Sequence, residues 1–209
     1  MSSAIYREYI QIPLDRVGPL IGRNGSIKRE IEETYGVKLE IEGSTGRICI
    51  ELLNPSDPSK LLTVKSIIEA IGHGINPEKA LEIFSEEDAA LHIINLKQIV
   101  GDSRDNLRRI KGRIIGEKGK ARRLIEELTN TSISVSEHTI AIVGKLENVE
   151  VARRAIEMLI SGSPHNVVWR YLYGMRRKLK RRGFLLWEPE VAFKTQDVEG
   201  MEEGDEKGG

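Results

Sequence analysis

The sequence predicts an α+β protein built from two related domains. Shifting the chain by 94 positions aligns residues 20–25, LIGRNG, with residues 114–119, IIGEKG, and the shared register continues over about 30 residues. Hydrophobic periodicity gives both copies one order of elements, namely strand, helix, helix, strand, strand, helix. Of the 209 residues, 39% are hydrophobic, which is enough to build a core in each domain.

The first copy is expected to occupy residues 1–74. Alternating apolar residues predict its strands, Gly36 ends its second helix, and Gly43–Gly46 forms a turn between the last two strands. Pro58 is expected to begin the final helix, which ends at Gly72. The other predicted elements are Tyr9–Leu14, Asp15–Ile21, Ser26–Tyr35, Val37–Glu42 and Arg47–Leu52.

A helical linker is expected over residues 75–91, with short helices beginning at Asn76-Pro77 and at Ser85. The second copy then takes residues 92–163. Its predicted elements are His92–Val100, Asn106–Ile115, Lys120–Leu128, Ser132–Ser136, Thr139–Gly144 and Glu147–Ile160.

A basic helix is expected over residues 164–183, because an apolar stripe recurs at helical spacing after Pro164. The stripe consists of Val168, Leu172, Met175 and Leu179. Residues 184–209 carry eight acids against two lysines, and we expect this tail to be partly disordered.

The net charge is zero, but the charges are unevenly distributed. Arg104–Arg123 contains nine Lys and Arg against two acids, and Pro164–Gly183 contains seven against none. Two basic blocks in a neutral chain are typical of an anionic partner bound at a defined surface, although solvated helix faces would give the same pattern.

Several classes of protein are excluded by what the chain lacks. The apolar runs are too short for a membrane span or a secretory signal, so we expect a cytoplasmic protein. Cys49 is the single cysteine, and the four histidines have no metal-ligand spacing. Because no pattern of catalytic residues appears, we expect neither an enzyme nor a cofactor.

The two G-x-x-G loops are the candidate functional feature. Twenty glycines give roughly two such matches by chance, so the motif needs its context: both loops join two helices, follow Ile-Gly and precede a basic helix. Glycines would let a sugar-phosphate backbone lie on the loop, facing the free N–H groups of the next helix. The candidate binding residues are Gly22, Arg23, Asn24, Gly25, Lys28, Arg29, Arg113, Gly116, Lys118, Gly119, Lys120, Arg122 and Arg123.

I-G-x-x-G between two helices, in this order of elements, resembles a type I KH domain, of which the chain would hold two. The resemblance implies a three-stranded sheet packed on helices and a groove for about four nucleotides of single-stranded RNA or DNA. Matching positions would place Val17, Ile21, Leu39 and Ile41 in the first groove and Ile110, Ile114, Ile115, Ile133 and Val135 in the second, although a place in the core explains these residues equally well.

A narrower resemblance covers residues 5 to about 182. YIQIPLDRVGPLIGRNG, GINPEKAL, GRIIGEKG, HTIAIVG and SGSPHNVVW are similar to the archaeal Pno family, related to the Krr group. That family implies small-subunit ribosome assembly near the 3′ end of the rRNA, with a Nob-type endonuclease as partner. Two departures from general KH domains are Lys28 and Arg122, where an Ile is usual, and the acidic Glu117 inside the second loop.

The leading interpretation is therefore a non-catalytic RNA-binding assembly factor. An RNA-binding module of another machine, such as an exosome cap or a transcript regulator, and a nucleotide-processing enzyme are the alternatives. Trp169 and Tyr173 could stack on bases, whereas Tyr171 is expected to pack with the apolar stripe.

Overall fold

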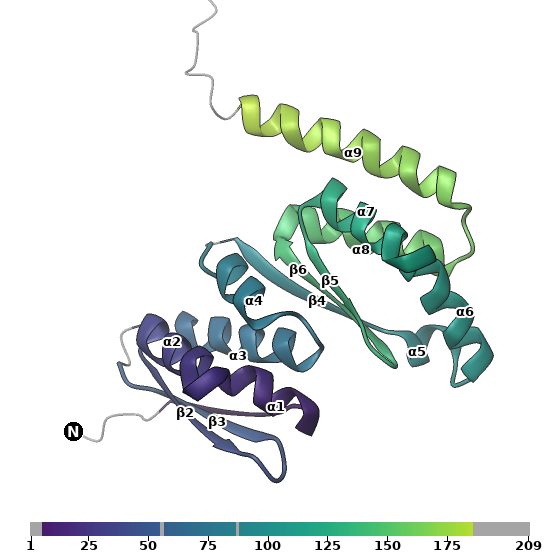
Figure 1. The fold of residues 1–209 in the computed structure, drawn as a ribbon. Coiled ribbons are helices and arrows are strands. Elements are labelled where there is room, and N and C mark those ends of the chain that lie inside the picture. Colours follow the sequence, from purple (N-terminus) through teal and green to yellow (C-terminus); the bar gives the residue numbers. More distant parts are fainter. Residues whose placement is uncertain (1–5, 55–56, 87, 186–209) are drawn as a thin grey trace, which may run out of the picture.

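The computed structural model describes residues 6–54, 57–86 and 88–185, and it contains two domains of the same architecture (Figure 1). Each domain has a three-stranded antiparallel sheet with helices packed on it. The expected order of strands and helices is confirmed in both copies. In each sheet the last strand of the domain lies between the other two, giving the orders β1-β3-β2 and β4-β6-β5.

The first domain follows the predicted elements closely. Gly36 ends α2 with a left-handed φ of 64°, as a helix stop requires. The strands alternate between buried and exposed residues, and Leu39 lies opposite Ile50 in the register. The elements are β1 (Arg7–Gln11), α1 (Leu14–Ile21), the 3₁₀ turn η1 (Arg23–Gly25), α2 (Ser26–Tyr35), β2 (Val37–Glu42), β3 (Arg47–Leu52) and α3 (Ser59–Gly72).

The linker contains α4 (Pro77–Phe84), and the second domain begins at Ala89. In the second domain the helices α6 and α7 flank the second glycine loop. Its elements are β4 (Ala89–Asn95), α5 (Leu96–Val100), α6 (Arg104–Ile115), the 3₁₀ turn η2 (Glu117–Gly119), α7 (Lys120–Thr129), β5 (Ser132–Val135), β6 (Thr139–Lys145) and α8 (Leu146–Ile160), followed by α9 (His165–Leu185).

Three of the predicted elements are wrong in part. The strand expected over His92–Val100 ends at Asn95, because the Asn95 side chain accepts a hydrogen bond from the Gln98 N–H and starts the short helix α5. The linker helix expected at Ser85 is absent among the described residues of this segment, and β4 begins four residues later, at Ala89. The first strand is Arg7–Gln11 rather than Tyr9–Leu14, because Leu14 already begins α1.

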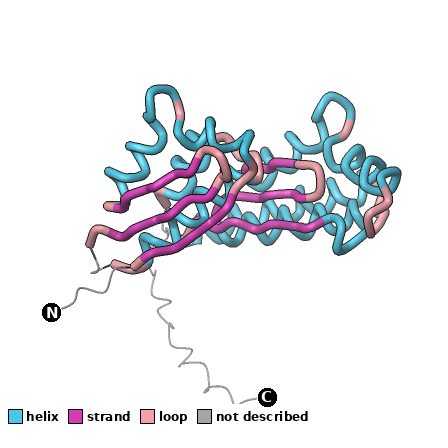
Figure 2. Tube along the Cα trace, turned by 90° about the horizontal axis from the view of Figure 1, so that it is seen from below, coloured by secondary structure: helices cyan, strands magenta, loops and turns pink. Residues whose placement is uncertain are grey.

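Strand β6 joins the two domains through its two faces. Ile140 and Ile142 belong to the core of the second domain, whereas Ala141 and Val143 belong to the core that contains α3 and α4. Such a strand is buried on both sides, which explains its continuous apolar run. The second sheet is therefore covered by its own helices on one face and by α3 and α4 on the other (Figures 1 and 2).

Polar contacts also hold the junction between the domains. His73, at the end of α3, shares a hydrogen bond of 3.1 Å with the Thr139 hydroxyl through its Nδ1. The Ser136 hydroxyl donates to the His73 carbonyl at 3.0 Å. Burial lowers the pKa of His73, an effect that Glu69 opposes, so the neutral imidazole is favoured at this junction.

Helix α9 packs on the second domain through the predicted apolar stripe. Val168 and Leu172 are fully buried, and Met175 and Leu179 pack against the same core. Tyr171 packs there too, as expected. Trp169 is partly buried and its ring contacts His165, with centroids 5.5 Å apart. Residues 186–209, most of the expected acidic tail, lie outside the described residues.

Candidate nucleic-acid interface

The two glycine loops have almost the same backbone. Gly22 and Gly116 have φ/ψ of 73°/177° and 70°/178°, and the middle residues Asn24 and Lys118 have 52°/27° and 51°/29°. Both loops close with a hydrogen bond from the second glycine N–H to the first glycine carbonyl, at 3.3 and 3.2 Å. The repeat seen in the sequence is thus a repeat of local geometry.

The two glycines of each loop meet different constraints. A Cβ on Gly116 would lie 2.6 Å from the Ala121 Cβ and 2.9 Å from its backbone nitrogen, and Gly22 is similarly crowded by Ile27. A Cβ on Gly119 would meet nothing within 4 Å, and one on Gly25 only the Arg29 side chain at 3.9 Å. The first glycine lets the helices pack closely, whereas the second leaves open space above the start of the next helix.

Arg29 and Arg123 hold the loops in shape. The Arg29 guanidinium donates to the Asn24 carbonyl at 2.7 Å and to the Gly25 carbonyl at 3.3 Å. Arg123 donates to the Lys118 carbonyl at 2.8 Å. These two predicted binding residues therefore stabilise the left-handed middle residue of each loop, and they place a positive charge beside it.

Lys28 and Arg122 occupy matching positions beside the two grooves. Lys28 lies 3.8 Å from Glu32, and the Arg122 Nε lies 3.7 Å from Glu126. Each glutamate also accepts a backbone N–H of the neighbouring strand at 2.8 Å, from Leu39 in the first domain and from Ile133 in the second.

Glu32 and Glu126 thus fix a cation between the helix and the strand in both domains. Sequence reasoning aligned these two glutamates in the repeat without assigning them a role. The signal that could have found them is an acid one helical turn after the unusual cation.

The predicted groove residues divide into two groups. Ile21 and Ile41 in the first domain, and Ile115 and Val135 in the second, are partly exposed and occupy equivalent positions 94 residues apart. These four are the predicted groove residues that stay accessible to a ligand. The remaining five are buried in the cores, so they support the grooves from below: Val17, Leu39, Ile110, Ile114 and Ile133.

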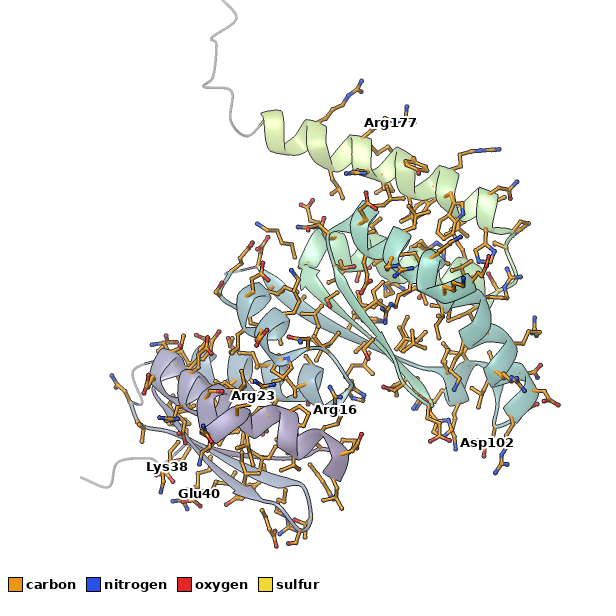
Figure 3. The ribbon with its side chains drawn as sticks, viewed as in Figure 1. Arg16, Arg23, Lys38, Glu40, Asp102 and Arg177 are labelled. Atoms are coloured by element: carbon orange, nitrogen blue, oxygen red, sulfur yellow. The ribbon has the colours of Figure 1, made fainter. Side chains whose placement is uncertain are left out.

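The Arg113 side chain is occupied by hydrogen bonds within the protein. Its guanidinium donates to the Leu159 carbonyl at 3.3 Å and to the Ser163 carbonyl at 2.6 Å, at the end of α8. Arg16 makes the equivalent contacts at the end of α3, to the carbonyls of Ile71 and Ile75 (Figure 3). Arg113 is therefore placed to position the helices around the second loop.

The remaining predicted site residues form the exposed surface of the loops. Arg23 and Asn24 are exposed in the first loop, and Lys118 and Lys120 in the second. The acidic Glu117 is exposed beside Lys118. On the helix leading into the second loop, Arg104, Arg108 and Arg109 are exposed as well. Helix α1, before the first loop, carries Arg16 as its one cation, and that guanidinium is bonded to the carbonyls of Ile71 and Ile75.

Other kinds of site find little support in the described part of the chain. No cluster of three or more His, Cys, Asp or Glu side chains that could hold a metal ion occurs among the described residues. No helix among them is long and apolar enough to span a membrane.

Comparisons with known proteins agree with this geometry. Residues 7–76 match the KH domain, and residues 90–177 match the eukaryotic type KH domain, type I, in the form of the second KH domain of Pno1. The fold and its two loops thus define a tandem KH-domain protein.

Similarity over nearly the whole chain identifies the family. The chain is 41% identical to the KH domain-containing protein MJ0443 of Methanocaldococcus jannaschii, over 94% of this chain and 83% of that protein. It is 29% identical to the pre-rRNA-processing protein PNO1 of Saccharomyces cerevisiae, over 83% of this chain and 64% of that protein. The chain belongs to the Pno1 family of KH-domain proteins, as the sequence motifs indicated.

Solved structures give the same result. A protein of unknown function from Aeropyrum pernix, APE0754, superposes with a TM-score of 0.83 at 40% identity, over 88% of this chain and 97% of that one. Dim2p of Pyrococcus horikoshii, in a complex with a/eIF2alpha and rRNA, superposes with a TM-score of 0.78 at 39% identity, over 85% of this chain and 97% of that one.

Proposed function

We propose that the protein binds single-stranded RNA through both KH domains, near the 3′ end of small-subunit rRNA, and serves ribosome assembly without catalysing a reaction. One observation carries this proposal: two loops with the same φ/ψ values occur in two copies of one fold, and each directly follows a partly exposed isoleucine, Ile21 or Ile115. The middle residues Asn24 and Lys118 also have left-handed φ values of 52° and 51°, and non-glycine residues in such strained conformations cluster at functional sites.

Different groups in each proposed groove suit different parts of the RNA. The Ser26 and Lys120 N–H groups donate to the Arg23 and Glu117 carbonyls, so the N–H groups that follow them in the first turn of α2 and α7 are those that can donate to phosphate oxygens lying on the loop. Ile21 with Ile41, and Ile115 with Val135, offer apolar surface to the faces of bases. Lys28 and Arg122, between helix and strand, can donate to polar base edges or to phosphate.

The relatives support the identity of the RNA. The Saccharomyces cerevisiae relative is a pre-rRNA-processing protein, and the Pyrococcus horikoshii relative is part of a complex with rRNA. We propose that this chain binds the corresponding RNA and presents it to a Nob-type endonuclease. Catalysis would then reside in the partner.

Charge reversal in the loops tests RNA binding and ranks the domains. Lys118→Asp with Lys120→Asp is expected to weaken RNA binding by at least about 30-fold, or about 2 kcal/mol, because both lysines are exposed in a loop whose preceding helix carries further exposed cations. Arg23→Asp with Asn24→Asp should cost less, because the surroundings of the first loop are less basic.

Fluorescence anisotropy with RNA from the 3′ end of small-subunit rRNA measures both losses. The melting temperature of each double variant serves as the control for folding, and it should be unchanged because all four side chains are exposed. Unchanged affinity in both variants would refute RNA binding by these loops. A larger loss in the first-loop variant would reverse the ranking of the domains.

A further inference from the structure

Helix α9 has a solvent face that no contact within the described chain explains. Four cations opposite its buried stripe are exposed, with intervals of seven, one and three residues between them: Arg170, Arg177, Lys178 and Arg181. This spacing places them on one side of the helix, over roughly 16 Å at 1.5 Å per residue. Arg177 points away from the rest of the domain (Figure 3). We call these four cations the α9 strip.

The cations of the α9 strip are unpaired with respect to the described residues. No carboxylate of residues 6–54, 57–86 or 88–185 lies within ion-pair distance of any of them. On the helix beneath, by contrast, Arg153 pairs with Glu150 at 2.8 Å and also with Glu157. Four unpaired cations along one line repel each other, so an anion that lies along the line is bound favourably.

A glycine in the middle of the α9 strip leaves room for close approach. Gly174 lies between Arg170 and Lys178 on the same face, and a Cβ there would meet nothing within 4 Å. The exposed ring of Tyr173 borders this position, with half of its surface accessible. A polyanion with planar bases fits such a surface, because cations, backbone space and an aromatic ring lie together.

Hydrogen bonds connect the beginning of α9, the helix that carries the α9 strip, with α6, the helix that leads into the second glycine loop. Arg113, three residues before Gly116, donates to the Ser163 carbonyl, and His165 Nε2 donates back to the Arg113 carbonyl at 2.9 Å. The beginning of α9 is thereby held beside the end of α6. Farther along, Arg176 and Leu179 of α9 line one cleft with residues 127–130 at the end of α7. Helix α9 therefore runs beside α7, away from the loop (Figure 1).

We propose that the α9 strip is a second RNA-binding site, which takes the sugar-phosphate backbone of RNA extending beyond the nucleotides held at the second loop. This inference rests on the proposed function. A KH groove takes about four nucleotides, so a longer strand leaving the second loop needs another surface, and α9 begins beside the end of α6 that leads into that loop. Its ligand chemistry is a row of phosphodiesters, read without base specificity.

Two RNA lengths separate the α9 strip from the KH groove. The probes are a 16-nucleotide RNA from the 3′ end of small-subunit rRNA and the best-binding 6-nucleotide RNA tiled across it. The variant is Arg170→Ala with Arg177→Ala and Lys178→Ala. The matched control, Lys79→Ala with Lys97→Ala and Arg154→Ala, removes three exposed cations that are ion-paired elsewhere.

The strip variant is expected to bind the 16-nucleotide RNA at least about tenfold more weakly, and the log–log salt slope should become shallower by about 2, at ~0.7 per phosphate. Its affinity for the 6-nucleotide RNA and its melting temperature should stay unchanged, as should all affinities of the control. Equal losses for both RNA lengths, an equal loss in the control, or no loss at all would overturn the proposal.

Failure of the proposed function gives a different result. In that case the unmodified protein would not bind the 6-nucleotide RNA, or reversal of Lys118 and Lys120 would leave that binding intact. An α9 strip that instead binds an acidic protein would leave both RNA affinities unchanged in the strip variant, which also overturns the proposal.

Discussion

Alanine at the two glycines of the second loop should separate the packing role of the loop from its binding role. Gly116 has φ 70° and ψ 178°, and a Cβ there would clash with the Ala121 backbone and side chain. Gly119 has φ 78° and ψ 11°, and a Cβ there would point into open space. The two substitutions add the same methyl group three residues apart, so their effects differ through the backbone conformation and the surroundings of each position.

The structure gives a magnitude for each change. Gly116→Ala combines a backbone conformation that is almost restricted to glycine, at about 1–3 kcal/mol, with overpacking, at about 1–3 kcal/mol, for a total of about 3 kcal/mol or more. Gly119→Ala carries only the left-handed penalty of about 1 kcal/mol. At about 2–4 °C per kcal/mol, the melting temperature should fall by roughly 6–12 °C and by 2–4 °C, respectively.

Gly119→Ala, which costs less stability, is the substitution expected to weaken RNA binding. The methyl group of Gly119→Ala occupies the open space where the phosphate backbone is proposed to lie. RNA binding should therefore weaken about tenfold, or 1.4 kcal/mol, although the variant loses little stability. Gly112→Ala, at an exposed position in the last turn of α6, is the control and should raise stability by about 0.5–1 kcal/mol. Equal losses of stability for Gly116→Ala and Gly119→Ala, measured by thermal melts, would refute the assignment of separate roles.

Three further predictions concern stability. Leu172→Ala, which empties a fully buried position, should lower the free energy of unfolding, measured in urea, by about 2–5 kcal/mol. Tyr173→Ala, on the exposed side of α9, should lower it by less than about 1 kcal/mol. Similar losses for the two variants would contradict the packing of α9. Because burial lowers the pKa of His73 below the unfolded value of about 6.5, its contribution is fully present above that pH and is lost as the pH falls from there to the folded pKa. His73→Gln should flatten the pH dependence of unfolding in that window, and an unchanged slope would count against the idea. Glu126→Ala should lower the free energy of unfolding by about 1–3 kcal/mol, because the Ile133 N–H loses its acceptor; no change in a urea titration would show that water replaces the carboxylate.

The repeat made most of the fold predictable from the sequence. Alternation in residues 37–42 and 47–52 gave two strands whose bounds the structure reproduces, and glycines 36 and 72 marked helix ends. The strand prediction for residues 92–100 failed because two local structures compete there: the Asn95 side chain starts a helical turn in a segment whose apolar residues also suit a strand. Periodicity alone does not weigh a side-chain cap against continued strand pairing.

The burial of individual side chains and their hydrogen-bond partners could not be predicted from the sequence. Alternation placed Leu39 and Ile41 on one face of a strand, but only the packed structure buries the first and leaves the second partly open. Arg113 and Arg123 looked alike as free cations near a glycine loop. Their guanidinium groups bind carbonyls that the tertiary fold brings within reach, and no spacing rule reports that. The packing of the two domains through both faces of β6 was likewise not predicted.

The RNA bound by the protein in cells tests the central claim most directly. Ultraviolet crosslinking of the tagged full-length chain, followed by sequencing of the attached RNA, identifies that RNA without assuming its sequence. We expect reads concentrated at the 3′ region of small-subunit rRNA, and fewer of them for the Lys118→Asp, Lys120→Asp variant at equal protein level. Reads spread over many transcripts, or no crosslinked RNA above background, would contradict the central claim.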